Sequence, residues 1–393
     1  MKQKLKNIYH LLQAIVANIV YGFPSHKIKV IGVTGTDGKT TTTHLLYHIL
    51  QSSGKKVSML STIYAKVGGK ELDTGFHVTT PDSFLVQQLI RKAVQNGDEY
   101  FILETTSHAL DQNRIWGVRI AVAVLTNITH EHLDYHKSIE EYSRTKWKLV
   151  EMAQVAVVNG DDTIISELAK SLKLKVKSLK TYGLESTADY SIDFRKELAQ
   201  LADFNAYNYL GAYAACRELG LSDKEIRAAL PSYVLPAGRI DIVYQKKFMI
   251  IVDFAHTPNG IARILETVKK QYVHGEGKLI HVFSSAGLRD HTKRFAMGEA
   301  SARYADISYI TEEDYRTEDP QKIADEIGAG FGKKQYFTEL NREKAIHLAI
   351  DLAQPNDVVI ITGKGHEKSL CRGTVEYPWS DIECVKNYVS TLS

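Results

Sequence analysis

The segment that most constrains the fold is Gly32–Thr41, which reads Gly-Val-Thr-Gly-Thr-Asp-Gly-Lys-Thr-Thr. It follows the apolar run Ile28–Ile31 and precedes a helical pattern. A glycine-rich turn in that context lets backbone N–H groups converge on phosphate oxygens, and the helix N-terminus adds partial positive charge. Lys39 then reaches the β- and γ-phosphates and Thr40 binds Mg²⁺. Val33 stands where the strict phosphate-loop pattern has glycine, so the loop is a variant. The alternative is a turn without a ligand.

Short β-rich runs alternate with amphipathic helical patterns along the chain, which implies mostly parallel sheets with helices on both faces. The predicted strands are Lys29–Val33, Tyr100–Glu104, Ile120–Asn127, Val155–Asn159, Met249–Phe254, Leu279–Phe283, Ile307–Thr311 and Val358–Thr362. The predicted helices include Thr41–Ser52, Pro81–Asn96, Ile139–Met152, Pro258–Tyr272 and Arg342–Ala353. We predict an α/β protein with a P-loop-containing central domain on a mostly parallel sheet and a C-terminal Rossmann-like α/β domain.

We place the boundary between these domains near Leu235–Arg239, because a helical region, Asn205–Ala229, ends there and a new strand-first series begins. The expected division is an N-terminal amphipathic helix at residues 1–26, a central domain at 27–238 and a C-terminal domain at 239–393.

Composition excludes several classes of protein. The formal net charge is only +3, which gives no electrostatic case for nucleic acid as a partner. Cys216, Cys371 and Cys384 lie far apart without a CxxC pair, which excludes a disulfide framework and a cysteine-built zinc site. Scarce cysteine fits a reducing cytoplasm. The chain has no apolar run long enough for a transmembrane segment.

The first 22 residues predict a helix with one apolar face. That face is read from the spacing of Leu5, Ile8, Leu12, Ile15 and Ile19. The favoured interpretation is a helix packed on the domain behind it. The alternative is a peripheral membrane contact, since Lys2, Lys4 and Lys6 open the segment.

Acidic and histidine residues follow predicted strands, where ligands gather in parallel α/β sheets. Glu104 ends an apolar strand, so it is a candidate Mg²⁺ ligand or, alternatively, a helix cap or surface acid. The run Asn127–His136 suggests His/Asp metal chemistry, including zinc, although residues two apart seldom all bind one ion. Lys146 in isolation is typical of a solvated helix lysine.

Taken together, these segments resemble the Mur ligases, and the likeness runs in the family's motif order from about Val30 to Glu367. Within the family, the chain is similar to the branch that adds a diamino acid to the D-Glu carboxylate of UDP-linked muramyl dipeptide. The resemblance implies an ATP-dependent ligase of peptidoglycan precursor synthesis that works through an acyl phosphate. It also implies ATP and two Mg²⁺ ions as cofactors.

The resemblance assigns roles residue by residue. The ATP-binding positions are Gly35, Thr36, Asp37 (usually Asn in the family), Gly38, Lys39, Thr40, Thr41, Asn208, Arg239 and Asp253. The catalytic positions are Lys39, Glu104, His132 and Lys146, and the metal-binding positions are Thr40, Glu104, His132 and Lys146. Lys146 falls on the lysine that the family carbamylates, so here the resemblance replaces the solvated-lysine interpretation.

Substrate contacts follow from the same likeness. The muramyl-peptide positions are Thr79, Thr80, Thr106, Gln112 and Arg114, and the remaining substrate positions are Arg289, Asp314, Arg316, Gly363 and Glu367. The family's DNPR motif appears as Glu313–Arg316, and the retained Arg316 favours diaminopimelate because a guanidinium pairs bidentately with its distal carboxylate. Glu367 is expected at the distal ammonium.

Only 31 residues precede Gly32, too few for the N-terminal domain with which the family grips uridine diphosphate. We therefore expect an acceptor held by the muramyl peptide alone, presented by a partner that supplies the UDP-binding role, or linked to something other than UDP. The competing interpretations are a folylpolyglutamate-like or cyanophycin-like ligase, and a non-catalytic ATP-binding subunit. Intact Lys39, Glu104, His132 and Lys146 count against the latter.

Overall fold

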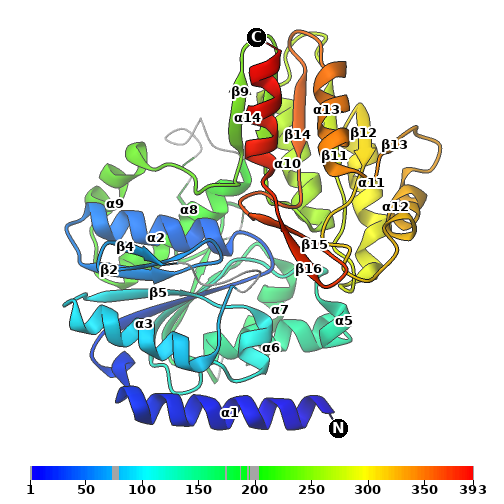
Figure 1. Ribbon diagram of the computed structural model, residues 1–393. Helices are drawn as coiled ribbons and strands as arrows, with labels where there is room; N and C mark the ends of the chain where they lie inside the picture. Colours follow the sequence, from blue (N-terminus) through cyan, green and yellow to red (C-terminus); the bar gives the residue numbers. More distant parts are fainter. Residues whose placement is uncertain are drawn as a thin grey trace. The chain divides into compact units, whose positions relative to one another are not determined.

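The structure is a computed structural model that describes residues 2–72, 79–172, 175–185, 187–192, 194 and 203–392. The chain divides into two compact units, coloured along the sequence in Figure 1. Unit 1 consists of Met1–Thr129 and Ser138–Val234, and unit 2 of His130–Lys137 and Leu235–Ser393.

The described residues of unit 1 form one sheet of eight strands in the order β4-β3-β2-β5-β1-β6-β7-β8. The strands are β1 (Lys29–Thr34), β2 (Val57–Leu60), β3 (Ala65–Val67), β4 (Lys70–Leu72), β5 (Tyr100–Glu104), β6 (Ile120–Leu125), β7 (Ala153–Asn159) and β8 (Leu179–Tyr182). The pairs from β2 through β8 are parallel, whereas β3 and β4 add an antiparallel edge.

Helices cover both faces of this sheet. They are α1 (Lys2–Tyr21), α2 (Lys39–Ser52), α3 (Ser83–Gln95), α4 (Ser107–Asp111), α6 (Ile139–Met152), α7 (Thr163–Leu172), α8 (Asp203–Glu218) and α9 (Asp223–Ala229), with 3-10 turns η1 (Pro24–His26) and η3 (Leu230–Ser232). Successive strand residues point to opposite faces. Ile31 therefore joins a core with Leu46 and Leu210, and Val30 joins another with Leu149. In Figure 1, α2 and α8 lie on one face and α3 and α6 on the other.

Helix α1 packs on α3 with the face opposite to its predicted apolar face. Ala14, Ala17 and Asn18 are fully buried, whereas Leu5 and Ile19 are about two-thirds exposed, at 63% and 64%. Small side chains allow close approach to α3, and the Asn18 amide donates a hydrogen bond of 2.7 Å to the Trp116 carbonyl, which lies outside that helix. The predicted helix and its packing on the domain behind it are thus confirmed, but the packed side chains are small ones and not the large residues of the apolar face.

Unit 2 is built on a second, mostly parallel sheet. Its described strands are β9 (Asp241–Gln245), β10 (Met249–Val252), β11 (Leu279–Phe283), β12 (Ile307–Ile310), β13 (Phe337–Thr338) and β14 (Val358–Ile361), in the order β13-β12-β11-β14-β10-β9. Only β9 is antiparallel to its neighbour. A separate hairpin pairs β15 (Ser369–Arg372) with β16 (Val375–Pro378).

The helical elements of unit 2 are α5 (Leu133–His136), α10 (Pro258–Gln271), η4 (His291–Lys293), α11 (Arg294–Tyr304), α12 (Pro320–Gly328), η5 (Ala329–Phe331), α13 (Arg342–Leu352) and α14 (Asp381–Thr391). Within the described part of the chain, no helix is both long enough and apolar enough to cross a bilayer.

The predicted strands and helices all occur, with shifts of a few residues at their ends. The predicted helical region Asn205–Ala229 is one correction, because it divides into α8 and α9. Gly220 adopts φ +96° between them, and the hydroxyl of Ser222 begins α9 by accepting a hydrogen bond from the N–H of Glu225. A positive φ and a new cap end one helix and start the next.

Candidate active site

The sheet of unit 1 reverses its winding at β1, which lies between β5 and β6. The strands that follow β1 in the chain, β2 to β5, lie on one side of it in the sheet, and β6 to β8 lie on the other. The carboxyl ends of β5, β1 and β6 therefore border a crevice suited to a ligand. The loop 35–38 follows β1, Glu104 ends β5, and Thr126 and Asn127 follow β6. The predicted phosphate loop and the predicted acid therefore meet at one edge of the sheet.

Two loop positions require glycine. Gly35 has φ +152°, and a Cβ there would lie 1.8 Å from the Thr126 hydroxyl. Gly38 has φ +82° at the start of α2, and a Cβ there would lie 2.2 Å from the Asn208 side-chain oxygen. Asn208, assigned to ATP by resemblance, thus stands directly against the loop. Its amide also donates to Asn205 at 3.0 Å.

The loop is braced from the end of β6. The side chain of Asn127 accepts a hydrogen bond from the Asp37 N–H at 2.9 Å and donates to the Asp37 carbonyl at 3.0 Å. The Thr126 hydroxyl donates to the same carbonyl at 2.7 Å. Thr36 accepts from the Thr129 N–H at 2.9 Å. Asn127 and Thr126 hold the loop in place, and the sequence analysis placed both at the end of a predicted strand without giving Thr126 a role.

Two lysines converge on the same backbone. The Lys39 ammonium folds back to donate to the carbonyl oxygens of Gly35 at 3.0 Å and Thr36 at 2.7 Å. Lys146, on α6, is 1% exposed, and its ammonium donates to Gly35 at 2.5 Å. It also lies 4.6 Å from the ring centre of Tyr142. The interpretation of Lys146 as a solvated helix lysine is therefore wrong, because this side of α6 faces the phosphate loop and not water.

Glu104 is fully buried and connects the loop to a second strand end. One carboxylate oxygen accepts hydrogen bonds from the hydroxyls of Thr40 at 2.9 Å and Thr62 at 2.7 Å, and the other accepts from the Thr62 N–H at 2.9 Å. The surface-acid alternative for Glu104 is excluded by this burial. Clustered carboxylate and hydroxyl oxygens are the donors that Mg²⁺ prefers, so these residues fit the expected ion.

Thr62 is a site residue that the sequence analysis missed. It follows β2, and its hydroxyl lies 3.1 Å from the Thr79 hydroxyl. Its position after a buried strand adjacent to β5 was the available signal, since the carboxyl ends of parallel strands share an edge.

The predicted muramyl-peptide residues form one connected group. The Thr80 hydroxyl donates to the Glu104 carbonyl at 3.0 Å and accepts from the Thr106 N–H at 3.0 Å. Arg114 donates to the Thr80 carbonyl at 2.8 Å and, through two nitrogens, to the Gln112 amide oxygen at 3.0 and 2.7 Å. Because Thr106 also caps α4, a short helix and a strand end fix the whole group beside Glu104.

The predicted metal-binding His132 lies in the segment of chain that belongs to unit 2. It adopts φ +58° at the start of α5. The neighbouring Glu131 is buried and pairs with Lys293 at 3.1 Å. The Leu133 N–H donates to Asp290 at 3.1 Å. Although burial opposes it, hydrogen bonds from Thr292 and Leu133 hold the pKa of Asp290 below its usual range. The segment is thereby tied to Asp290 and Lys293, which lie close in sequence to the predicted substrate residue Arg289.

Two predicted nucleotide-binding residues of unit 2, Arg239 and Asp253, meet the predicted substrate segment Gly363–Glu367 at the end of β10. Asp253 is 6% exposed and accepts two backbone N–H bonds at 2.9 and 2.7 Å, while burial raises the pKa of its carboxyl despite the nearby Arg239. The Arg239 guanidinium lies 4.7 Å from the Phe254 ring centre. A Cβ on Gly238 would lie 2.4 Å from the backbone nitrogen of His366. Burial lowers the pKa of His366 to about 4, so this imidazole is neutral near pH 7.

A dense charge cluster follows β12 and β14. Lys364 is fully buried and pairs with Asp314 at 2.9 Å and with Glu367. The Arg316 NH1 donates to the Gly287 carbonyl at 2.8 Å, and its NH2 lies 4.0 Å from Asp314. The structure therefore brings the predicted Asp314, Arg316 and Glu367 together. It adds Lys364, to which the sequence analysis assigned no role.

Glu313 is a second residue that the sequence analysis left without a role. It is 6% exposed, and one of its oxygens has no hydrogen-bond partner among the described residues. Burial, with the negative charge of Asp314, raises the pKa of Glu313 to about 7. A Cβ on the predicted Gly363 would lie 2.7 Å from this oxygen. The remaining predicted substrate residue, Arg289, is exposed.

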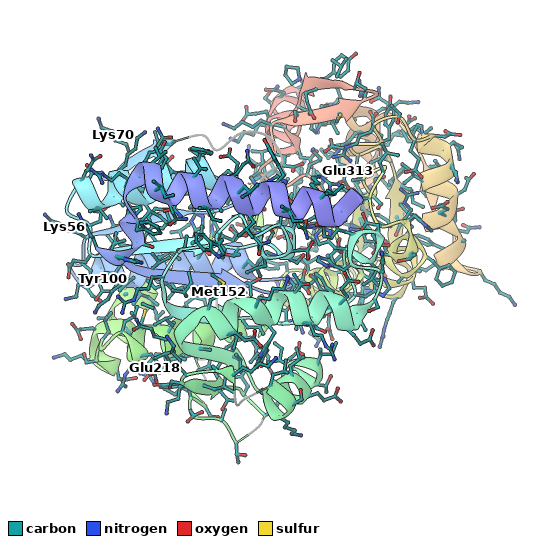
Figure 2. The ribbon with its side chains drawn as sticks, turned by 90° about the horizontal axis from the view of Figure 1, so that it is seen from below. Lys56, Lys70, Tyr100, Met152, Glu218 and Glu313 are labelled. Atoms are coloured by element: carbon teal, nitrogen blue, oxygen red, sulfur yellow. The ribbon has the colours of Figure 1, made fainter. Side chains whose placement is uncertain are left out.

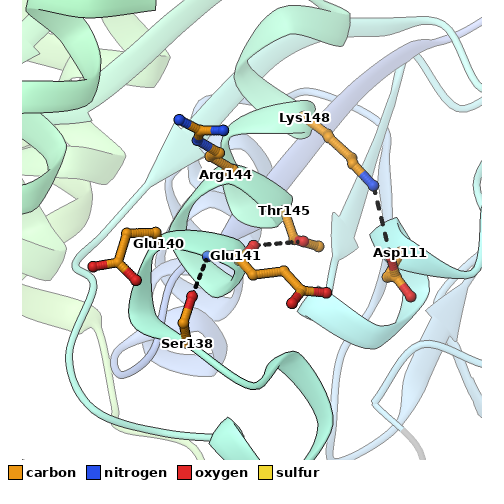
Figure 3. Close-up of a pocket in the computed structure, with 7 residues that line it drawn as sticks. All are labelled: Asp111, Ser138, Glu140, Glu141, Arg144, Thr145 and Lys148. Carbon is orange, nitrogen blue, oxygen red and sulfur yellow. Dashed lines mark hydrogen bonds and ion pairs between the residues drawn. The ribbon is translucent and has the colours of Figure 1, made fainter.

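A surface pocket of unit 1 lies apart from these residues (Figure 3). It is lined by Asp111, Ser138, Glu140, Glu141, Arg144, Thr145 and Lys148. Within the pocket Lys148 pairs with Asp111 at 3.8 Å, and Ser138 caps α6. None of them is a predicted site residue, so we attach no chemistry to the pocket.

Comparison with known proteins gives consistent matches along the chain. Residues 33–216 match the Mur ligase middle domain, and residues 238–365 match the Mur ligase glutamate ligase domain. The UDP-N-acetylmuramoyl-L-alanyl-D-glutamate–2,6-diaminopimelate ligase of Aquifex aeolicus (strain VF5) is 37% identical over 390 residues, 94% of this chain and 79% of that protein.

Solved structures give the same picture. A UDP-N-acetylmuramoyl-L-alanyl-D-glutamate–2,6-diaminopimelate ligase superposes with a TM-score of 0.60 at 28% identity, covering 93% of this chain and 79% of that one. A folylpolyglutamate synthase of Mycobacterium tuberculosis, complexed with ADP and AMPPCP, gives 0.72 at 17% identity over 90% of this chain and 92% of that one, a similarity of fold alone.

Proposed function

The chain belongs to the Mur ligase family, and we propose that it adds diaminopimelate to the D-Glu carboxylate of a muramyl dipeptide. Membership makes the protein an ATP-dependent ligase. The relatives named for diaminopimelate addition support the choice of amino acid. The proposal places the reaction in the cytoplasm, where ATP and the amino acid are available.

The observation that carries the proposal is the buried network of unit 1. Thr40, Glu104 and Lys146 surround the phosphate loop, and Glu104 is linked by backbone and hydroxyl contacts to the Thr80–Arg114 group. A nucleotide-binding loop that shares a buried carboxylate with a second polar group suits transfer of phosphate from ATP to a bound acid.

The proposed chemistry has two steps. The D-Glu carboxylate attacks the γ-phosphorus of ATP and displaces ADP, which leaves an acyl phosphate. The amine of the diamino acid then attacks the acyl carbon, gives up its proton, and inorganic phosphate leaves. Lys39 and the loop N–H groups hold the phosphates and offset the negative charge that develops during transfer.

Thr40 and Glu104 would hold Mg²⁺, with His132 and Lys146 as the other proposed metal-binding positions. When bound, Mg²⁺ supplies charge neutralisation on the triphosphate. Carbamylation would convert Lys146 from a buried cation into an anion. We include it in the proposal because the resemblance assigns it to this position, and because an anion there would complement Mg²⁺ where an ammonium would oppose it.

Selection of diaminopimelate rests on the charges of unit 2. NH1 of Arg316 is tied to a backbone carbonyl, which fixes the plane of the guanidinium. A fixed guanidinium pairs well with the distal carboxylate that lysine lacks. Glu367, beside Lys364, supplies negative charge for the distal ammonium.

The test is an ADP-release assay that crosses UDP-linked and UDP-free muramyl dipeptide with diaminopimelate and lysine, followed by mass analysis of the product. We expect turnover only when a dipeptide and diaminopimelate are both present, and the productive arm identifies the carrier of the dipeptide. ADP release that saturates without any amine would contradict a ligase, and turnover with lysine alone would contradict the proposed amino acid.

A further inference from the structure

The outer face of α1 carries an unusual concentration of exposed apolar side chains. The outer face of α1 consists of Leu5 (63% exposed), Ile8 (55%), Tyr9 (58%), Leu12 (57%), Val16 (48%), Ile19 (64%) and Val20 (63%). Their spacing of three and four residues places them in one stripe along the helix. Isolated exposed apolar residues are normal, but a continuous stripe marks a surface that binds something.

Folding of unit 1 does not explain this stripe, because α1 is attached through other residues. The Asn18 amide donates to the Trp116 carbonyl at 2.7 Å, and the Asn7 amide donates to Asp111 at 3.0 Å. Arg91 of α3 donates to the Tyr21 carbonyl at 3.2 Å. These contacts hold both ends of the helix. In Figure 2, which views the molecule from below, α1 lies across the near side of unit 1.

Charge distinguishes between the possible occupants of the outer face. Lys2, Lys4 and Lys6 lie at the beginning of α1, and the chain contains no acidic residue before Asp37. A helix with a long apolar stripe and clustered lysines is typical of segments that lie in the plane of an anionic bilayer. Each lysine near such a surface is attracted to anionic headgroups. The helix is not apolar enough to cross a bilayer, which fits attachment to its surface.

We propose that the outer face of α1 binds the surface of an anionic membrane. The apolar stripe enters the boundary between headgroups and acyl chains, while the positive charge at the beginning of the helix attracts anionic headgroups. The anchored face of α1 keeps unit 1 folded and attached. This inference is separate from the proposed ligase activity, since it uses none of the residues assigned to that chemistry.

The test is co-sedimentation of the full chain with vesicles of phosphatidylcholine alone and of an equal mixture of phosphatidylcholine and phosphatidylglycerol. We expect binding to the mixed vesicles only, weakened by added salt. Replacing Lys2, Lys4 and Lys6 by Gln should weaken binding at least about tenfold, because each lysine contributes about fivefold near such a surface. The double variant Leu12→Ser/Ile19→Ser should abolish it.

Leu12 and Ile19 are exposed, so the double variant should keep its thermal midpoint and its ADP release in the absence of vesicles. The matched control is Val375→Ser/Leu392→Ser, which removes side chains of similar exposure (51% and 54%) from unit 2 and should leave vesicle binding intact. Equal binding to both vesicles, no binding to either, or binding that survives Leu12→Ser/Ile19→Ser would overturn the proposal. So would a concentration-dependent dimer that this variant abolishes, in place of vesicle binding.

Discussion

The Lys146 ammonium donates a hydrogen bond of 2.5 Å to the Gly35 carbonyl, although the two residues are 111 positions apart. This contact joins α6 to the phosphate loop. It also places a buried cation next to the backbone that the Lys39 ammonium contacts at 3.0 Å. The charge state of Lys146 therefore acts directly on the loop, because electrostatic interactions are strong where water is excluded.

We expect Lys146→Ala to reduce ADP release by about a hundredfold or more, in line with the loss of one preorganised electrostatic group. A small added carboxylate, such as acetate, should restore part of the activity if Lys146 acts as a carbamate. The matched control is Lys148→Ala on the same helix, because Lys148 is 46% exposed and pairs only at 3.8 Å. Equal losses for both variants would show that α6 tolerates no truncation, and would remove the special role of Lys146.

Gly35→Ala should abolish ATP binding and lower the thermal midpoint. Its Cβ would lie 1.8 Å from the Thr126 hydroxyl, in a loop braced on all sides. The matched control is Gly54→Ala, since Gly54 also has a positive φ (+74°) but faces open space. That variant should cost only the backbone strain of about 1 kcal/mol. Nucleotide titration and thermal unfolding of both proteins separate the clash from the strain, and ATP binding by Gly35→Ala at normal affinity would refute the close packing.

Local pattern predicted most of the elements because the signals are short-range. Strand β5 and helix α6 occur with the predicted bounds, Tyr100–Glu104 and Ile139–Met152. Periodicity did not reveal which face of α1 packs inward, since Ala14, Ala17 and Asn18 are weak hydrophobic signals. Their burial depends on two tertiary contacts, the close approach of α3 and the hydrogen bond to the Trp116 carbonyl. Pattern alone favours the larger side chains.

The site shows the same division. Lys39 and Thr40 could be placed from a local motif, whereas the burial of Lys146 followed only from the family resemblance. Thr62 and Lys364 were not singled out, because each acts through a partner far along the chain, Glu104 and Asp314 respectively. Residues whose chemistry is marked by a local motif can be predicted from one sequence. Residues that act by holding another residue in position cannot.

Thr62→Val should impair the enzyme by releasing Glu104, without removing any predicted ligand. The variant removes the hydroxyl that donates to Glu104 at 2.7 Å while keeping the side-chain volume. We expect the Mg²⁺ concentration for half-maximal ADP release to rise, with much of the rate recovered at high Mg²⁺. Thr62→Ser keeps the hydroxyl and should behave as the unaltered protein. A loss of rate that Mg²⁺ does not rescue would point to a role other than positioning Glu104.

Glu313 predicts a pH dependence of stability. Its pKa is raised from 4.5 to about 7, so the unfolded chain loses this proton first as pH increases. The contribution is fully present below pH 4.5 and is lost as pH rises through 7, by up to roughly 3 kcal/mol. Glu313→Gln should therefore flatten the free energy of unfolding between pH 4.5 and 7, and should stabilise the protein at pH 8. Urea unfolding across this range checks the prediction, and unchanged curves would show that Glu313 is ionised like an exposed acid.

Arg316→Lys should change the choice of amino acid more than the use of ATP. The Arg316 guanidinium is fixed by its hydrogen bond of 2.8 Å to the Gly287 carbonyl. Lysine keeps the charge but cannot form two parallel hydrogen bonds to a carboxylate. We expect the KM for diaminopimelate to rise by about tenfold or more, the equivalent of about 1.4 kcal/mol or more for a lost charge-assisted contact, while the KM for ATP stays constant. Arg303→Lys on the exposed side of α11 is the control and should change neither. If both KM values rise together for Arg316→Lys, the substitution has disturbed unit 2 as a whole, and Arg316 does not select the amino acid.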